Sequence, residues 1–265
     1  MRRSLHLALR RPAALTVALL AFGCTRAHSA YIPRDRTLAA LPLYFYPNQT
    51  RRPLKATVFF FGNDIGFWEA HQRLAERLSA HGYSVIGFDV KKYLETLPAE
   101  PLARRGAVAR ELPLIIARAI HELDADASPL ILAGHSFGAD VALWSGAVAR
   151  IPRVVGVLAI SPTLRSHLRV TPLDLANANE PTESGSFAAA DEIRDMPAGI
   201  AIALVRGSGD KRRAMDPSLV AAGGGRVDYR VIPFAGHSLK SLTIAGPMIV
   251  SAVDRLVAEG ARYSH

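Results

Sequence analysis

The chain has 265 residues, 49% of them hydrophobic, with a formal net charge of +9 at pH 7 and one cysteine. This length and apolar content suffice for one domain with a sizeable core, while a single cysteine excludes an internal disulfide framework and a thiolate metal cluster. The lysines and arginines are scattered and lack interleaved aromatic residues, so no nucleic-acid partner is expected.

The first thirty residues have the layout of an export signal. The basic stretch MRRSLHLALRR is followed by the apolar run PAALTVALLAFG and then by small residues. Residues 1–30 are therefore predicted to be a signal peptide or lipoprotein signal, and 31–265 the exported domain. Cys24 ends the apolar run, as in a bacterial lipoprotein cleavage box, where the cysteine carries the lipid. Cleavage near AHSA (27–30), which would discard Cys24, is the alternative.

Both cleavage schemes predict a periplasmic or cell-envelope protein, which is lipid-anchored in the first case. Four arginines precede Cys24, so a chain that begins there carries a net charge of +5. This mild positive charge suits a membrane surface with anionic phospholipid head groups, although an ordinary solvated surface explains it equally well.

From residue 55 onward, short apolar runs alternate with stretches of helical spacing. The expected strands are 55–62, 83–89, 129–134, 153–161, 198–207 and 227–234. The expected helices are 67–82, 103–123 with a bend at Pro113, 137–150, and a C-terminal helix that is firm from Met248. The alternation predicts an α/β protein with a mostly parallel sheet flanked by helices, whose ligands bind beyond the carboxyl ends of the strands.

Residues 162–197 interrupt this alternation with a long polar and turn-rich segment. Connections of this length are often functional, so the segment is predicted to be a lid-like insertion over the active site. A surface excursion without a role is the alternative.

The strand 129–134 and the helix 137–150 are joined by the sequence Gly-His-Ser-Phe-Gly, in which Ser136 is the central residue. A serine between two glycines at a sharp strand-to-helix turn is typical of a nucleophile elbow. Ser136 is therefore the predicted nucleophile. Asp140, one turn into the helix, is explained by the favourable interaction of a carboxylate with the helix dipole.

A serine nucleophile needs a histidine base and an acid that orients the histidine, and on this fold both follow the serine in chain order. His237, after the last predicted strand, is the expected base, because His167 lies in the lid-like segment and His265 is terminal. Asp210 directly follows the strand 198–207 and is the expected acid. Asp216, in the turn MDPS, stays open as the alternative.

An oxyanion hole requires two backbone N–H donors. The N–H of Phe137, the residue after the nucleophile, is the first candidate. The second is expected from the turn FFFGNDIGFW, with Asn63 preferred and Asp64 as the alternative. No zinc-ligand spacing, phosphate-binding loop or dinucleotide fingerprint occurs, so no metal or cofactor is expected.

Three segments, GHSFGADV, GNDIGFW and HGYSVIGFDVKKY, together resemble the bacterial virulence-protein VirJ/AcvB group of α/β hydrolases. The elbow matches at residues 136–140, and the third segment at Gly82, Tyr83, Val85, Gly87, Asp89 and Tyr93. The oxyanion turn departs from the pattern, since Ile65 replaces a glycine and Phe67 precedes Trp68. The resemblance implies an α/β-hydrolase fold and a periplasmic serine hydrolase, and in some relatives the activity is hydrolysis of aminoacyl-phosphatidylglycerol.

We therefore expect an exported serine hydrolase that cleaves an ester through Ser136, Asp210 and His237. Its ester substrate would be aminoacyl-phosphatidylglycerol or another lipid-linked ester. A non-catalytic envelope adaptor on the same fold and a general carboxylesterase for small soluble substrates are the alternatives. The complete set of three residues argues against the adaptor.

Overall fold

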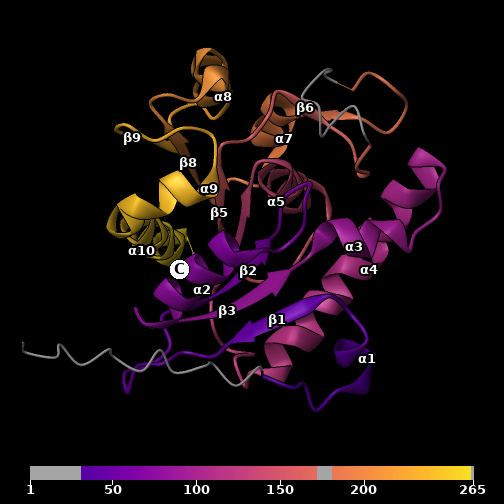
Figure 1. The fold of residues 1–265 in the computed structure, drawn as a ribbon, viewed down its shortest axis with the longest axis vertical. Helices are drawn as coiled ribbons and strands as arrows, with labels where there is room; N and C mark the ends of the chain where they lie inside the picture. The colour runs from indigo at the N-terminus through magenta and orange to yellow at the C-terminus, as the bar shows by residue number, and fades with distance from the viewer. Residues whose placement is uncertain (1–30, 172–180, 264–265) are drawn as a thin grey trace, which may run out of the picture.

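The computed structural model describes residues 31–171 and 181–263. The predicted signal peptide with Cys24, the middle of the predicted lid and His265 therefore lie outside the described residues. Seven strands form one sheet in the order β1-β3-β2-β4-β5-β8-β9, in which only the edge pair β1–β3 is antiparallel (Figure 1). The strands are β1 (Leu43–Tyr46), β2 (Ala56–Phe61), β3 (Tyr83–Phe88), β4 (Leu130–His135), β5 (Val154–Ile160), β8 (Ala201–Gly207) and β9 (Val227–Ile232).

Helices cover both faces of this sheet. The helices α2 (Glu69–Ser79) and α10 (Gly246–Tyr263) pack on one face, and α4 (Pro101–Glu122) and α5 (Phe137–Val148) pack on the other. Shorter elements are α1 (Arg36–Ala39), α3 (Val90–Glu95), α7 (Ala189–Asp195), α8 (Asp216–Ala222), α9 (Leu239–Leu242), η1 (Lys211–Met215), η2 (Thr243–Ala245) and the hairpin of β6 (Arg165–Ser166) and β7 (Phe187–Ala188).

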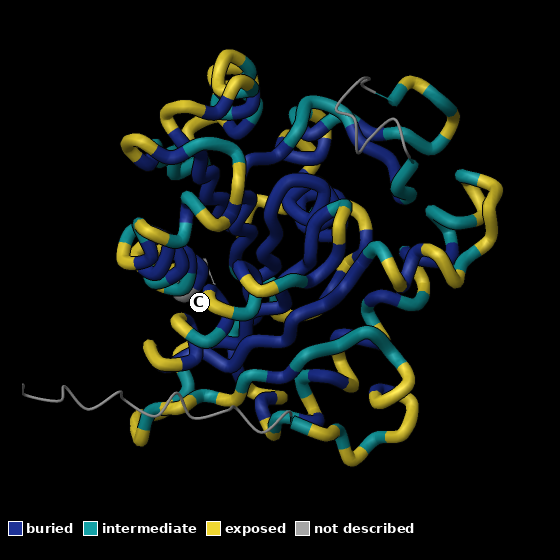
Figure 2. Tube along the Cα trace, viewed as in Figure 1, coloured by how far each residue is buried: buried dark blue, intermediate teal, exposed yellow. Residues whose placement is uncertain are grey.

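The alternation of side chains along β2 explains why the protein has two apolar layers. Val58 and Phe60 belong to the buried cluster beneath α2 and α10, whereas Phe59 and Phe61 belong to the cluster beneath α4 and α5. Successive side chains of a strand point to opposite faces, so a strand buried on both faces must be apolar throughout. Figure 2 shows the central strands as a continuous buried layer.

The predicted mostly parallel sheet flanked by helices is confirmed, and all six expected strands are present within a few residues of their predicted ends. The sequence analysis did not identify β1, a four-residue edge strand in which Phe45 is buried and the other three residues are partly buried. The helix α4 runs without interruption across Pro113.

Much of the described part of 162–197 belongs to the core and does not form a separate cover. Leu168, Phe187, Ile193 and Met196 are all buried in the cluster beneath α5, and α7 packs against α5 and α8. Leu168 and Phe187 in particular pack inside the protein and do not line its surface. A lid role for the remainder of the segment stays a prediction.

Among the described residues, the helical stretch Leu239–Gly260 is long and apolar enough, by length and composition, to cross a membrane. Within it, α10 packs against β5 and β8, and Ile249, Val253 and Leu256 are buried there. Its apolar side is thus used in the core of the domain.

Candidate active site

Ser136 lies between β4 and α5 at the carboxyl edge of the sheet, in a backbone conformation that is rare for a serine. Its φ of 53° and ψ of −123° fall outside the regions that L-residues favour, and such strain is concentrated at functional sites. The N–H of Ser136 donates to the carbonyl of Ile160 in β5 at 2.8 Å, which ties the turn to the neighbouring strand.

The two glycines of the elbow are required by close backbone contacts. A Cβ atom on Gly134 would lie 2.0 Å from the carbonyl oxygen of Gly138. A Cβ on Gly138 would lie 2.3 Å from the carbonyl oxygen of Gly62 and 2.4 Å from that of Phe61. Only glycine allows the elbow to approach the turn after β2, which is the turn expected to contribute to the oxyanion hole.

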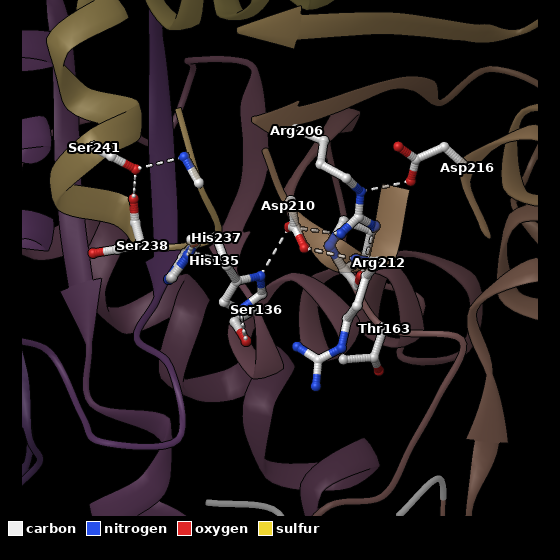
Figure 3. Close-up of polar contacts among 12 residues, drawn as sticks. His135, Ser136, Thr163, Arg206, Asp210, Arg212, Asp216, His237, Ser238 and Ser241 are labelled. Atoms are coloured by element: carbon white, nitrogen blue, oxygen red, sulfur yellow. Dashed lines mark hydrogen bonds and ion pairs between the residues drawn. The ribbon is translucent and has the colours of Figure 1, made fainter. Parts of the chain in front are cut away.

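Ser136, His237 and Asp210 form a chain of hydrogen bonds, although they come from three separate loops (Figure 3). The hydroxyl oxygen of Ser136 lies 3.0 Å from Nε2 of His237, and Nδ1 of His237 lies 2.9 Å from Oδ2 of Asp210. With Nδ1 protonated, the imidazole donates to Asp210 and leaves Nε2 free to accept the serine proton. This is the geometry that nucleophilic catalysis by a serine requires.

Asp210 is almost completely buried and remains ionised because donors surround it. Burial by itself raises the pKa of this carboxyl group, but the hydrogen bond from His237, the N–H of Arg212 and the charge of Arg206 together hold the pKa well below its usual range. The structure brings Asp210 and not the alternative Asp216 to His237, because Asp216 is engaged by Arg206 and Tyr229.

Arg206, in β8, is a site residue that the sequence analysis missed. It is 1% exposed and donates to Asp210 and to Asp216 (Figure 3). It also donates to the carbonyl of Pro162. A charged residue inside the apolar strand AIALVRG is the signal that could have revealed it, because arginine is rarely buried without charged partners.

His135, next to Ser136, also contacts the loop that carries His237. Its Nε2–H donates to the backbone carbonyl of His237 at 2.8 Å, and the two rings lie 5.4 Å apart between centroids. Burial lowers the pKa of His135 to about 4, so this imidazole is neutral at ordinary pH. It therefore holds the loop of His237 without adding a second positive charge beside it.

The two expected oxyanion donors, the N–H groups of Phe137 and Asn63, differ in whether they already have an acceptor. Phe137 is the first residue of α5, so its N–H has no acceptor within the helix and is available at the helix N-terminus. The N–H of Asn63 instead donates to the carbonyl of Gly66 at 3.2 Å. Asn63 would have to give up or share this bond to stabilise an oxyanion, and its role stays a prediction, as does that of Asp64.

Asp140 has a structural role that its helix position did not indicate. It is 1% exposed and accepts hydrogen bonds from the N–H and the hydroxyl of Thr163, at 2.8 and 2.7 Å. Thr163 is the second residue of the long segment 162–197, so Asp140 anchors the start of that segment to the elbow helix. His167, the rejected histidine, is paired with Glu183 in the same segment.

A mostly parallel, helix-covered sheet with a serine elbow, a histidine and an acid at the carboxyl ends of its strands defines an α/β-hydrolase fold. The model of the family described as bacterial virulence protein (VirJ) matches residues 55–228, and the chain belongs to this family. That range includes Ser136 and Asp210 and ends before His237. A search of curated protein sequences gives no match.

Solved structures of other proteins share the fold. The protein Est1E from Butyrivibrio proteoclasticus aligns with a TM-score of 0.59 at 12% identity, over 82% of this chain and 94% of its own. A soluble variant of monoglyceride lipase from Saccharomyces cerevisiae gives 0.58 at 15% identity, over 81% and 91%. The esterase domain of a Rhodothermus marinus protein gives 0.55 at 16% identity, over 81% and 92%. At these identities the likeness concerns the fold.

Proposed function

We propose that the protein is a serine hydrolase that cleaves carboxylic esters. The observation that carries this proposal is the continuous set of contacts from Ser136 through His237 to Asp210, at 3.0 and 2.9 Å. The strained serine and the buried, ionised acid support it, because neither is needed for the stability of a binding protein.

In the proposed reaction, the Ser136 oxygen attacks the ester carbonyl carbon while its proton passes to Nε2 of His237. The Phe137 N–H stabilises the negative charge that develops on the carbonyl oxygen. His237 then gives its proton to the departing alcohol oxygen, which leaves an acyl group on Ser136. Water, deprotonated by the same histidine, releases the acid and restores the serine.

A lipid-linked ester is the substrate that we favour within this class. Phe234 is fully exposed three residues before His237, and Ile65 is exposed in the turn that follows β2. Both loops border the site, so an apolar substrate would cover side chains that are otherwise in contact with water. Together with the family resemblance, this supports aminoacyl-phosphatidylglycerol or a related lipid ester over small soluble esters.

We also propose an envelope location, which the sequence of residues 1–30 supports. If Cys24 carries a lipid, Cys24→Ser should release the protein from the membrane fraction. An unchanged distribution between membrane and soluble fractions would favour cleavage near Ala30 and a protein without a lipid anchor.

Labelling of the purified protein with a fluorophosphonate probe tests the proposed chemistry without a known substrate. We expect the unaltered protein to be labelled and Ser136→Ala to be unlabelled, with thermal stability nearly unchanged. Full labelling or full esterase activity of the alanine variant would refute the proposal. Comparison of a short p-nitrophenyl ester with vesicles that contain aminoacyl-phosphatidylglycerol then separates a general carboxylesterase from a lipid hydrolase.

A further inference from the structure

Arg206 connects the proposed acid to a second buried carboxylate. Its Nη1 lies 3.0 Å from Oδ2 of Asp210, and its Nε lies 2.6 Å from Oδ1 of Asp216. The side chains of all three residues are 1–2% exposed, so water does not reach the ion pairs. The other oxygen of Asp216 accepts a hydrogen bond from Tyr229 at 2.6 Å, which fixes the far end of the network.

The contact between Arg206 and Asp210 uses the same oxygen that binds the histidine. Oδ2 of Asp210 accepts from Nδ1 of His237 at 2.9 Å and from Nη1 of Arg206 at 3.0 Å. Oδ1 accepts from the N–H of Arg212 at 2.9 Å. The carboxylate thus has one fixed orientation, while its charge is shared between an imidazole and a guanidinium group.

We propose that Arg206 is a positioning residue for Asp210, and that the Arg206–Asp216 pair sets the pH range in which His237 acts as the base. This inference rests on the proposed hydrolase function. The third donor group of Arg206 supports the positioning role, because Nη2 donates to the carbonyl of Pro162 at 2.8 Å and so prevents rotation of the guanidinium.

The direction of the electrostatic effect on His237 follows from the order in which Asp210, Arg206 and Asp216 lie behind it. The negative charge of Asp210 stabilises the imidazolium form of His237, and the positive charge of Arg206 on the shared oxygen opposes this stabilisation. Asp216 lies on the far side of Arg206 and partly cancels its charge. Removal of Arg206 should therefore favour the imidazolium, and removal of the charge on Asp216 should disfavour it.

The other groups around His237 are the same in all the variants compared. His135 is neutral, Ser136 is uncharged, and Arg212, whose N–H donates to Asp210, keeps its positive charge throughout. The Arg206–Asp216 pair is the pair of opposite charges that the described residues place directly behind the acid.

The test is the rate of labelling by a fluorophosphonate probe as a function of pH, since the reaction needs neutral His237. In Arg206→Gln the acid limb of the profile should move to higher pH by about 0.5–1 unit, and in Asp216→Asn it should move to lower pH by a similar or smaller amount. Arg206→Lys, which keeps the charge, should restore the midpoint while the maximal rate stays reduced, because lysine lacks the planar fork.

A double variant tests the same electrostatic effect at a smaller cost in stability. Arg206→Gln with Asp216→Asn removes both buried charges together, which is less costly than leaving one unpaired. Its midpoint should lie between that of Arg206→Gln and that of the unaltered protein. Arg230→Gln is the matched control, since Arg230 also lies in a strand and pairs with an aspartate, Asp228, but has no bond to Asp210.

The outcomes separate the two proposals. If the unaltered protein is not labelled, the hydrolase proposal fails. If it is labelled, but Arg206→Gln and Asp216→Asn move the midpoint in the same direction or not at all, only the role of the Arg206–Asp216 pair is refuted. A purely structural role would lower the rate in both variants without opposite shifts of the midpoint.

Discussion

Replacement of Asp140 by asparagine should remove a contribution that lowers the stability of the protein as the pH rises. Burial raises the pKa of this carboxyl group to about 6, although the hydrogen bonds from Thr163 act in the opposite direction. In the unfolded chain the group returns to its ordinary value of 3.8. The folded protein therefore binds this proton more tightly than the unfolded chain does.

The sign and size of the effect follow from this difference. Because the folded pKa is raised, the contribution of the group to stability is fully present below about pH 3.8 and is lost as the pH rises through about 6. A difference of roughly two pKa units corresponds to about 3 kcal/mol, of which about 2 kcal/mol is lost between pH 4 and pH 7.5.

Urea unfolding at these two pH values, followed by tryptophan fluorescence, measures the effect. Trp144 is buried one turn after Asp140 and reports on the same helix. The unfolding free energy of Asp140→Asn relative to the unaltered protein should rise by about 2 kcal/mol from pH 4 to pH 7.5. Glu69→Gln, at an exposed carboxylate, is the control and should keep the original pH dependence. Equal pH dependence in Asp140→Asn and the unaltered protein would refute the reasoning.

Three further predictions concern the elbow, the acid and the long segment. Asp210→Asn should reduce ester turnover by about 10³–10⁴-fold, because the amide favours the wrong tautomer of His237, and a smaller effect than that of Asp216→Asn would show that the acid is misassigned. Gly138→Ala should cost about 1–3 kcal/mol of unfolding free energy and most of the activity, since its Cβ would lie 2.3 Å from the Gly62 carbonyl oxygen; unchanged urea unfolding and turnover would contradict the contact. Phe187→Ala should lower the unfolding free energy by about 3–5 kcal/mol, whereas a rise in KM at unchanged stability would indicate a channel-lining role instead.

The amino-acid sequence by itself determined the layered sheet and the position of the nucleophile. Strands such as 55–62 are apolar throughout because they are buried on both faces, and this pattern is local and readable. The elbow around Ser136 is likewise visible in the local sequence. Only glycine fits at positions 134 and 138, because a Cβ atom there would clash with the backbone. The position of His237 could also be predicted, because it follows the last strand and the order of strands and loops decides which edge of the sheet a loop reaches.

Only the tertiary structure decided between Asp210 and Asp216 and gave Arg206, Asp140 and Phe187 their partners. The role of each residue depends on contacts made in the folded protein or on a side-chain rotamer that packing selects. Such contacts and rotamers leave no periodic pattern in the sequence. Asp210 and Asp216 are six positions apart, chemically identical and both bonded to Arg206, so only the folded arrangement shows that Asp210 contacts His237 and Asp216 contacts Tyr229. Phe187 lies in a polar segment, and it is buried because its ring packs near that of Trp144 in α5, with 6.2 Å between the centroids.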